Sequence, residues 1–306
     1  MSATIETSIV IPTYRRPEHL ARVLASCCAQ QGDVGEFEIV VVDNDAAESA
    51  RPLVAQASRT SAIPIRYVPE PRRGISNARN TGVAQARGRY VAFIDDDEET
   101  DPSWLCRLLA TIRACAADAV TGPVYPRLPP GVPPLSLHQR RIYTRDARVP
   151  TGTPLARWSG IGNTLLDKTR CFTGPEPFDP RLGLSGGEDS LFLRGLFRRG
   201  RRIVWCAEAA AWESLSQDRL DTAYLLRRAF RSGQTYTFVC TATDPAEWPR
   251  ATGRMAVGAA QAVVYGAIAL PLRLVNRGAS LALLMKAVTG LGKLCWHPRM
   301  HLRLYR

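Results

Sequence analysis

The sequence predicts an α/β fold with a doubly wound, mostly parallel sheet, followed by an apolar helical segment. Through the first hundred residues, short continuously apolar runs alternate with helix-length amphipathic segments. Polar residues follow the end of each run, and the composition becomes apolar and basic near residue 250. Continuous apolar strands indicate a sheet that is covered on both faces, as parallel sheets are. Such sheets bind their ligands at the carboxyl ends of the strands.

The first hundred residues contain four expected strands and three expected helices in alternation. The strands are the apolar runs 8–12, 38–42, 65–68 and 90–94, and the helices are 19–31, 47–58 and 75–86. Pro17 suits the first turn of the first helix. No G-x-G-x-x-G sequence follows the first strand, which argues against a dinucleotide-binding dehydrogenase, and there is also no Walker-type lysine loop.

The pattern continues less regularly after residue 100. We expect helices at 104–116, 190–199 and 220–231, strands at 119–124, 161–166 and 202–205, and a glycine-rich turn at 183–189. Residues 126–157 are rich in Pro and Arg, and we expect a long loop there that forms a flap over the site. The expected organisation is one domain over residues 1–235 and a tail over residues 250–306.

The tail contains two apolar stretches, residues 255–272 and residues 279–294. Residues 255–272 hold no charged side chain, and their length is about that needed to cross a bilayer, but their Ala and Gly content makes insertion weak. We expect helices that lie in or dip into the cytoplasmic leaflet, with basic residues at the headgroup level. These basic residues are Arg273, Arg277, Lys286, Lys293 and Arg299. The alternative is a soluble helical hairpin packed on the core.

The net charge and the cysteine content indicate which kinds of binding partner and which cellular compartment to expect. A formal net charge of +12 suits a phosphorylated substrate or acidic headgroups, although it also fits an arginine-rich genome. No nucleic-acid-binding motif is present, so nucleic acid is not an expected partner. The eight cysteines form no C-x-x-C pair and are expected to be core residues in a reducing compartment. Because no secretory leader precedes the first strand, the main domain is expected to face the cytoplasm.

A run of acidic residues follows the fourth strand. Asp95, Asp96 and Asp97 are adjacent, and three clustered carboxylates are costly without a cation. Their hard oxygen atoms suit Mg²⁺ or Mn²⁺, ions that commonly bridge a diphosphate. The expected metal ligands are Asp95 and Asp97, which have the D-x-D spacing. The alternative is a solvated acidic turn, since Glu98 and Glu99 extend the run.

A second acidic pair follows two glycines. Gly186 and Gly187 permit a tight turn, and Glu188 and Asp189 then lie near a helix N-terminus. A carboxylate in this position can stay ionised and accept a proton as a general base. Asp189 is the predicted base, and Glu188 is the second catalytic candidate. The alternative is that both residues only cap the helix.

Several polar residues at strand ends are candidates for binding a nucleotide. Tyr14, after the first strand, could stack on a nucleobase, and Asp43, at the second strand end, could accept a hydrogen bond from a base N–H. Each alone is as often a packing or turn residue, and their order along the chain makes the set informative. The residues that precede the acidic run and could hold a base or phosphate are Arg73, Asn77, Arg79 and Asn80.

Taken together, these motifs resemble those of family 2 glycosyltransferases over roughly residues 5–235. The resemblance rests on Ile11-Pro12-Thr13-Tyr14, Val42-Asp43-Asn44, Ser76-Asn77-Ala78-Arg79-Asn80, Phe93-Ile94-Asp95-Asp96-Asp97 and Gly187-Glu188-Asp189. That family has the GT-A nucleotide-diphospho-sugar transferase fold and inverts anomeric configuration. Further stretches look most like bacterial succinoglycan-type exopolysaccharide transferases, which add glucose to an oligosaccharide on a polyprenyl diphosphate at the inner membrane. These stretches are Thr13-Tyr14-Arg15-Arg16-Pro17, Asp43-Asn44-Asp45-Ala46, Asp95-Asp96-Asp97-Glu98, Ser185-Gly186-Gly187-Glu188-Asp189 and Arg231-Ser232-Gly233-Gln234-Thr235.

The resemblance implies a role for each matched position. Tyr14 and Asp43 would contact uracil, Asp96 would lie near the ribose, Asp97 would ligate Mg²⁺ or Mn²⁺, and Asp189 would deprotonate the acceptor. The expected donor-nucleotide residues are Pro12, Thr13, Tyr14, Arg16, Asp43, Arg73, Asn77, Arg79, Asp95 and Asp96. Residues 5–125 would form the nucleotide-binding half of the domain, residues 126–235 the acceptor-side half, and residues 250–306 a membrane-associated tail.

Two departures from the family pattern refine this expectation. Trp212 stands near a position where relatives often carry a His that approaches the metal, and Trp cannot ligate a metal. The Q-x-x-R-W motif of processive synthases is absent, which favours addition of a single sugar. Residues 227–231, Arg-Arg-Ala-Phe-Arg, occupy a similar region of the chain.

The sequence thus predicts an inverting transferase that moves a hexose, with glucose favoured, from a UDP-sugar to a lipid-linked saccharide. The predicted location is the cytoplasmic face of the bacterial inner membrane. A second hypothesis keeps this chemistry with a lipopolysaccharide, glycolipid or protein acceptor. Two different classes of protein are less favoured by the motifs. One is a nucleotidyltransferase, which also uses paired acids and Mg²⁺, and the other is a non-catalytic nucleotide-sugar-binding protein.

Overall fold

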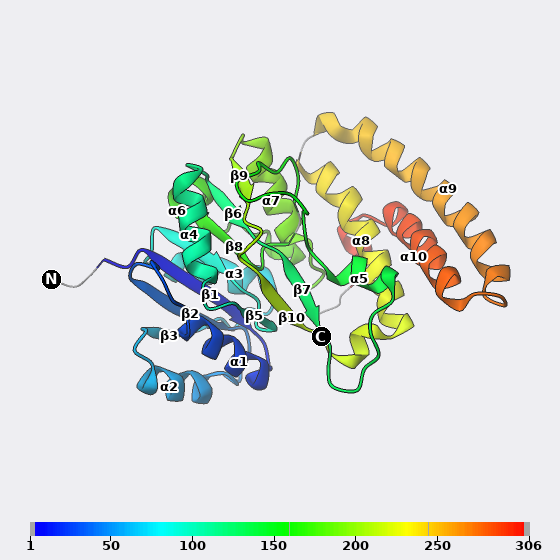
Figure 1. Ribbon diagram of the computed structural model, residues 1–306. Helices are drawn as coiled ribbons and strands as arrows, with labels where there is room; N and C mark the ends of the chain where they lie inside the picture. Colours follow the sequence, from blue (N-terminus) through cyan, green and yellow to red (C-terminus); the bar gives the residue numbers. More distant parts are fainter. Residues whose placement is uncertain (1–3, 159, 244, 303–306) are drawn as a thin grey trace. The chain divides into compact units, whose positions relative to one another are not determined.

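The computed structural model describes residues 4–158, 160–243 and 245–302, which form two compact units (Figure 1). The first unit comprises Met1–Gly183 and Phe192–Leu215, and the second comprises Leu184–Leu191 and Ser216–Arg306. These units are defined by backbone contacts. The division into residues 1–235 and 250–306 rests on composition and expected roles, and it stays a prediction.

A seven-stranded sheet forms the centre of the first unit, in the order β3-β2-β1-β4-β8-β6-β9. Strands β3, β2, β1 and β4 are parallel neighbours, β8 runs antiparallel to β4 and β6, and β9 is parallel to β6. The strands are β1 Thr7–Thr13, β2 Phe37–Asp43, β3 Ile65–Pro69, β4 Tyr90–Phe93, β6 Ala119–Thr121, β8 Thr164–Asp167 and β9 Ile203–Trp205. The predicted α/β fold with a mostly parallel sheet is confirmed.

Helices cover both faces of this sheet. Successive side chains of a strand point to opposite faces, and in the central strands the side chains on both faces are apolar. Ile9 and Ile11 pack in one core with α1 (Pro17–Cys28), α2 (Arg51–Thr60) and α4 (Trp104–Ala114). Val10 and Val42 pack in the other core with α3 (Ile75–Gln85) and with residues 192–196 of α7 (Glu188–Arg198). The continuous apolar runs in the sequence therefore supply two hydrophobic layers.

A small three-stranded sheet, in the order β5-β10-β7, was not predicted. It is formed by β5 (Glu98–Thr100), β10 (Ala211–Ser214) and β7 (Val124–Arg127). The single strand expected at 119–124 is two strands, β6 and β7, separated by Gly122 and Pro123. The expectation of a helix-free loop over 126–157 is wrong at α5 (Leu137–Tyr143), where Ser136 and Gln139 form a capping box. A short helix, α6, spans Lys168–Cys171.

The topology brings two polar strand ends together in the first unit. The chain passes from β1 to β2 and β3 on one side and then returns to β4 on the other side of β1. Thr13 ends β1, and Asp95 to Asp97 follow β4, whose register pairs Val10 with Phe93. This is a topological switch point, where open α/β sheets bind their ligands.

The second unit contains three long helices, α8 (Thr222–Thr243), α9 (Trp248–Leu272) and α10 (Arg277–Leu294). Helices α9 and α10 are antiparallel, because Ser280 donates to the carbonyl of Ala269 at 2.7 Å and Lys293 donates to Gln261 at 2.7 Å. Helix α8 extends beyond its expected end at residue 231, and α9 begins before residue 255. Short 3₁₀ turns lie at Gln217–Leu220, Pro245–Glu247 and Pro298–Met300.

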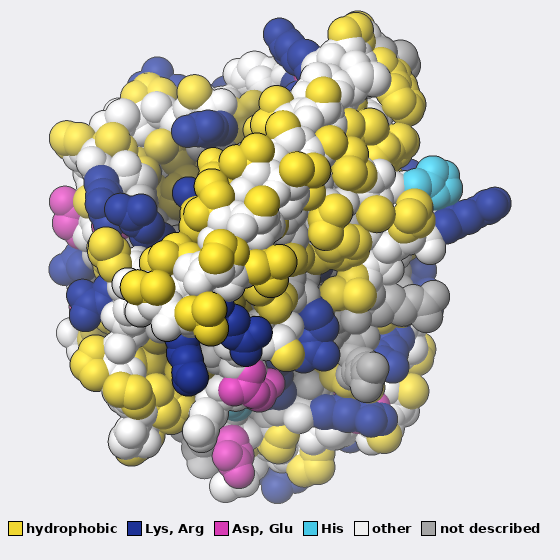
Figure 2. All heavy atoms as spheres, turned by 90° about the vertical axis from the view of Figure 1, so that its right-hand side faces the viewer, with side chains coloured by type: hydrophobic (Ala, Val, Ile, Leu, Met, Phe, Trp, Pro, Cys, Tyr) yellow, Lys and Arg dark blue, Asp and Glu magenta, His cyan; other side chains and the backbone are white. Residues whose placement is uncertain are grey.

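Helix α9 has an apolar outer face. Within the described part of the chain it is the one helix long and apolar enough to cross a membrane. Only Ala251, Gly258 and Ala269 among its residues are buried. Figure 2 shows hydrophobic side chains gathered in a continuous band over the C-terminal helices. The large exposed apolar residues of α9 and of the turn after it are Trp248, Val257, Val263, Val264, Ile268, Leu270, Leu274 and Val275.

Candidate active site

The loops after β1 and β4 are tied together by hydrogen bonds at the switch point. The Thr13 hydroxyl donates to Asp96 Oδ2 at 2.9 Å. One guanidinium nitrogen of Arg16, Nη1, lies 3.2 Å from Asp96 Oδ1 and 3.1 Å from Asp97 Oδ2. Thr13, Arg16, Asp96 and Asp97 were all predicted as site residues, and the fold brings these four together.

Negative charges repel one another in the acidic run, Asp95 to Asp97. Burial, and then the negative charge of Asp97, raise the pKa of Asp96 to about 6, whereas Arg16 and the Thr13 hydrogen bond lower it. Asp95 pairs with a second guanidinium, that of Arg79 on α3, at 2.9 Å. Arginines from α3 and from the loop before α1 therefore pair with all three carboxylates of Asp95, Asp96 and Asp97.

A third arginine–acid pair lies behind the acidic run and was not predicted. Glu98 is only 1% exposed, and its carboxylate is ion-paired with Arg145. Burial raises the pKa of Glu98, and the charge of Arg145 opposes this shift. Gly162 packs against the same acids, since a Cβ placed there would lie 2.6 Å from Glu98 Oε2 and 3.0 Å from Asp95 Oδ2. No local sequence pattern indicates that Arg145, 47 residues away, pairs with Glu98.

The chemistry of the acidic run fits a divalent cation that a substrate helps to hold. Within residues 4–158, 160–243 and 245–302, no three His, Cys, Asp or Glu side chains form a metal cage. Mg²⁺ is commonly bound by one or two carboxylates together with substrate phosphates, so the expected ligand pair Asp95 and Asp97 needs no third protein ligand, and their role as metal ligands stays a prediction. Trp212 lies on β10 opposite Glu99 of β5, with the guanidinium carbon of Arg127 5.9 Å from its ring centre, and it offers no ligand atom.

The predicted stacking residue Tyr14 is held by two arginines. The guanidinium carbon of Arg15 lies 5.1 Å from the centre of the Tyr14 ring, and that of Arg73 lies 4.9 Å from it. Both distances are within the range of cation–π attraction. Arg15 also forms two hydrogen bonds to Asp45, at 3.0 and 3.1 Å. The switch point thus presents an aromatic ring beside exposed positive charge.

Asp43 supports the backbone at the end of β2. Its carboxylate accepts hydrogen bonds from the amide N–H of Asp45 at 3.1 Å, the amide N–H of Ala50 at 2.8 Å and the Tyr67 hydroxyl at 3.1 Å. The residue is fully buried. Pro12, the residue paired with Val42 in the same register, is buried inside β1. The predicted contact between Asp43 and uracil stays a prediction.

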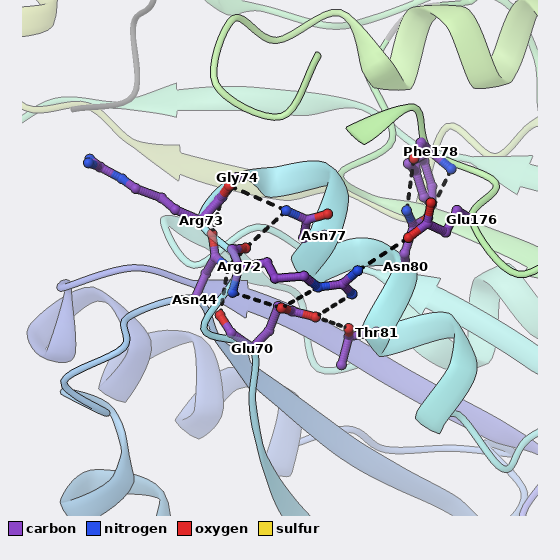
Figure 3. Close-up of polar contacts among 10 residues, drawn as sticks. All are labelled: Asn44, Glu70, Arg72, Arg73, Gly74, Asn77, Asn80, Thr81, Glu176 and Phe178. Carbon is purple, nitrogen blue, oxygen red and sulfur yellow. Dashed lines mark hydrogen bonds and ion pairs between the residues drawn. The ribbon is translucent and has the colours of Figure 1, made fainter. Parts of the chain in front are cut away.

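Asparagine side chains brace the loop between β3 and α3 (Figure 3). Asn44 donates to the carbonyls of Glu70 and Arg72, both at 2.9 Å, and accepts from the amide N–H of Gly74 at 2.7 Å. Asn77, a predicted nucleotide-binding residue, also donates to the Arg72 carbonyl, at 3.0 Å. In the structure both asparagines shape the loop that carries Arg73, and the nucleotide contact expected of Asn77 stays a prediction.

Glu70 fixes the same loop from its other side (Figure 3). Its carboxylate accepts three hydrogen bonds from Arg72, at 2.9, 3.0 and 2.9 Å, and one from the Thr81 hydroxyl at 2.5 Å. The side chain of Arg73 points away from this network, and Asn80 exchanges two hydrogen bonds with the backbone of Phe178, at 2.8 and 2.9 Å. The loop is therefore rigid, and Arg73 is left exposed on it.

The second predicted acidic pair lies in the second unit. Glu188 and Asp189 begin α7, after Gly186 and Gly187, which both have positive φ angles of 76° and 98°. Gly187 faces Thr235 of α8 so closely that a Cβ would lie 2.6 Å from the Thr235 methyl group. Glu188 is buried, whereas Asp189 is half-buried and accepts a hydrogen bond from the Ser190 amide at 2.6 Å. The expected glycine turn and helix start are present, and the catalytic roles of both acids stay predictions.

Comparisons with known proteins agree with this fold and these motifs. The family model described as glycosyl transferase family 2 matches residues 8–168, a range that includes the switch point and its acidic run. The chain is 36% identical over 238 residues to the succinoglycan biosynthesis protein ExoM of Rhizobium meliloti (strain 1021), and this match covers 76% of the chain and 74% of ExoM.

Two solved structures share the fold at low sequence identity. TarS residues 1–349 of S. aureus, in complex with UDP-GlcNAc, aligns with a TM-score of 0.52 and 16% identity, over 94% of this chain and 90% of that one. GalNAc-T7 with UDP, GalNAc and Mn²⁺ aligns with a TM-score of 0.56 and 16% identity, over 79% of this chain and 48% of that one. The predicted GT-A fold is confirmed, and the chain is an enzyme that belongs to glycosyltransferase family 2.

Proposed function

We propose that this glycosyltransferase moves a hexose, with glucose favoured, from a UDP-sugar to a polyprenyl-diphosphate-linked oligosaccharide in exopolysaccharide biosynthesis. The observation that carries the donor half of this proposal is the arginine-braced acidic run at the switch point. The acceptor half rests on the relation to ExoM, whose name assigns it to succinoglycan biosynthesis, and on the apolar face of α9.

The donor nucleotide has suitable partners at the ends of β1 and β4. The Tyr14 ring can stack on uracil, and the exposed guanidinium of Arg73 beside it can pair with a phosphate. Asp96, which Thr13 and Arg16 hold, is the proposed acceptor for a ribose hydroxyl. The solved relative TarS carries UDP-GlcNAc, which supports a UDP-sugar over other nucleotides.

The expected cofactor is Mg²⁺ or Mn²⁺, with Asp97 and Asp95 as its protein ligands. When bound, such an ion offsets the negative charge that builds on the leaving diphosphate. The relative GalNAc-T7 carries Mn²⁺ together with UDP, which favours the same arrangement. Arg16 forms ion pairs with both Asp96 and Asp97. When the donor and its metal ion bind, Arg16 must therefore release these carboxylates or share them with the ion.

Asp189 is the proposed general base. Its carboxylate accepts the proton of the acceptor hydroxyl as that oxygen forms a bond to the anomeric carbon. The bond from the anomeric carbon to the diphosphate breaks on the opposite face, so configuration inverts and UDP leaves. Asp189 lies in the first turn of α7, directly after the glycine turn.

The base assignment is tested with Asp189→Asn. We expect the variant to lose transfer by at least about a thousandfold, judged from the usual contribution of a general base together with loss of the anion. Binding of the UDP-sugar with Mn²⁺, measured by thermal shift, should be retained. Asp218→Asn, an exposed acid in the second unit, is the matched control and should keep full activity. Near-normal turnover by Asp189→Asn would remove this residue from the mechanism.

Donor and acceptor are tested separately. A thermal-shift screen of UDP-sugars with Mn²⁺ identifies the donor, because binding to the folded state raises its melting temperature. Radiolabelled donor incubated with total membrane lipids then identifies the acceptor by product analysis. Label in a lipopolysaccharide core, another glycolipid or protein would redirect the acceptor assignment, and release of pyrophosphate from a nucleoside triphosphate would indicate a nucleotidyltransferase.

The second unit is the proposed membrane-associating part, at the cytoplasmic face of the bacterial inner membrane. In a water-soluble amphipathic helix the apolar face points inward. Helix α9 has the reverse arrangement, since Val263 is 72% exposed and Leu270 is 70% exposed while Gln261 faces Lys293 of α10. Exposed apolar side chains of this kind suit a lipid environment, and a soluble helical hairpin would leave them facing water.

A further inference from the structure

Two cations in the second unit converge on one aromatic ring. The guanidinium carbon of Arg254, on α9, lies 4.4 Å from the ring centre of Tyr236 on α8. The ammonium nitrogen of Lys293, on α10, lies 5.7 Å from the same ring centre. Lys293 also donates to Gln261 of α9 at 2.7 Å. Three helices thus position two positive charges beside one exposed tyrosine.

These two cations have no acidic partner among the described residues. Neither Arg254 nor Lys293 takes part in an ion pair there, and their polar contacts are with Tyr236, Gln261 and the Cys240 sulfur. The sequence explains why, since residues 248–306 contain nine Lys or Arg and no Asp or Glu, and α8 contains no acid either. Burial, and then the positive charge of Arg254, lower the pKa of Lys293. Two positive charges beside one ring, with no acidic partner among the described residues, favour an anion close to them.

The cation pair lies on the inward side of α9, at one end of the α9–α10 pair. Arg254 and Gln261 are seven residues apart and therefore share the helix face that meets α8 and α10. The indole rings of Trp248 and Trp296 pack at the same end, with ring centres 5.5 Å apart. Tryptophan at the end of an apolar helix is typical of the level of lipid headgroups. Phosphate groups are the anions present at that level.

We infer that Arg254 and Lys293 form a binding site for the phosphate group of a membrane lipid. The guanidinium supplies paired N–H donors and the ammonium supplies a point charge, which together match a phosphate monoester or diphosphate. Tyr236 and Gln261 fix the two cations before the lipid arrives. This inference rests on the proposed membrane association, and it gives the second unit a specific headgroup contact in addition to an apolar face.

The test measures binding of the 306-residue chain to vesicles by co-flotation. Three compositions are compared: phosphatidylcholine alone, phosphatidylcholine with oleic acid, and phosphatidylcholine with phosphatidic acid, the last two matched in zeta potential. We expect the wild type to prefer phosphatidic acid over oleic acid by about tenfold, because the site recognises phosphate as well as charge. Arg254→Gln and Lys293→Gln should each abolish this preference, and Arg254→Lys should retain most of it.

Arg273→Gln is the matched control, since it removes one positive charge from an exposed position at the end of the same helix. It should weaken binding to both anionic vesicles equally, by no more than about fivefold, the contribution of one cation near an anionic surface. Circular dichroism melts establish that each variant is folded. An equal loss of the phosphatidic acid preference in Arg273→Gln, or its persistence in Lys293→Gln, would overturn the site.

Further measurements distinguish a lipid phosphate from a soluble phosphate, and failure of the phosphate site from failure of the proposed function. If inorganic phosphate at millimolar concentration competes fully with phosphatidic acid vesicles, the ligand is a soluble phosphate and the lipid assignment is wrong. If the wild type binds no vesicle at all, the membrane association fails together with this site. If vesicles bind but all variants behave as the wild type, only the phosphate site fails. Transfer activity with a UDP-sugar stands or falls independently of all three results.

Discussion

Asn163 supports the structure around the site from inside the first unit. Its side chain accepts a hydrogen bond from the Trp104 indole at 2.6 Å and donates to the carbonyls of Pro123 and Ala209, both at 2.8 Å. The residue is fully buried and has a φ angle of +57°, a conformation that Asn adopts more readily than most residues. It connects α4 to the segments before β7 and β10, and so it holds the small sheet beside the acidic run.

Asn163→Ala should strongly destabilise the first unit. The substitution removes the acceptor of a buried indole N–H and the amide donor of two buried carbonyls, of which Pro123 still accepts from the Ala211 amide at 2.9 Å. It also places Ala in the left-handed region. We expect the free energy of unfolding to fall by about 3 kcal/mol or more, measured by urea denaturation. Asn163→Gly is the control that keeps the backbone unstrained. If Asn163→Gly is as stable as the wild type, the hydrogen bonds contribute little and the backbone conformation explains the effect.

Glu70 should make stability depend on pH in the acidic range. Burial raises the pKa of this carboxyl, but hydrogen bonds from Arg72 and Thr81 outweigh burial, so the pKa lies below its ordinary value of 4.5. The stabilisation is therefore fully present above pH 4.5 and is lost as the pH falls through the lowered pKa. Glu70→Gln should flatten the melting temperature between pH 5 and pH 3. An unchanged pH profile in that variant would show that other carboxylates dominate.

Individual site residues were predictable where strand ends supplied the signal. Thr13, Asp96 and Asp97 follow apolar runs, so the topology alone brings them together. Arg145 and Asn163 were missed, because their partners Glu98 and Trp104 are separated from them by dozens of residues and no pattern links them. Asn44 and Asn77 were recognised as a motif, but the sequence could not reveal that their amides bind the protein's own backbone.

At the scale of elements, helix packing in the second unit depends on glycines. A Cβ at Gly233 of α8 would lie 2.1 Å from the Thr289 carbonyl oxygen of α10, and one at Gly292 would lie 2.0 Å from the Phe230 carbonyl oxygen. Gly258 and Gly290 permit a similarly close approach of α9 and α10. Small residues at such contacts allow backbones to pack tightly, as is common for helices in lipid.

Gly233→Ala should therefore destabilise the packing of α8 on α10. The added methyl group meets backbone atoms, which cannot move aside as a flexible side chain can, and we expect a loss of about 2 kcal/mol or more. Gly253→Ala is the matched control, because it lies on α9 with nothing within 4 Å of the added Cβ. The control should be neutral or stabilising by up to about 1 kcal/mol, from helix propensity. Thermal melts that rank the two variants in the opposite order would contradict this packing.

Elements were predictable in proportion to their length and regularity. The four parallel strands and their helices have strong apolar periodicity, and all were located to within a few residues. Strands β5 and β10 have three and four residues, and β5 reads Glu-Glu-Thr, so no apolar pattern marks it. These strands exist because they pair with each other, and such pairing between distant segments leaves no local signal. Helix α5 did carry a signal, the capping box at Ser136, within a segment whose prolines suggested a loop.

For the whole molecule, charge and hydrophobicity are distributed unevenly along the chain. Acidic residues are confined to the first 247 positions, and the last 59 are basic and apolar. The first unit carries the braced acidic run, and the second carries the exposed apolar face of α9 and the Arg254–Lys293 pair. A soluble donor needs a polar site such as the acidic run, and a lipid acceptor needs an apolar, basic surface such as that of the second unit. This distribution supports the proposed transfer at a membrane.

Val263→Asp should weaken membrane binding without affecting the fold. Val263 is 72% exposed on the apolar face of α9, so the substitution perturbs no core, but it places a carboxylate where we propose lipid contact. A charged group inside a bilayer costs about 3 kcal/mol at the centre and less near the interface, so partitioning into vesicles should fall by at least about tenfold. Leu137→Asp is the matched control, since Leu137 is 70% exposed on α5 of the first unit. Flotation that is equally reduced in both variants, or unchanged in Val263→Asp, would mean that the apolar face of α9 does not contact the bilayer.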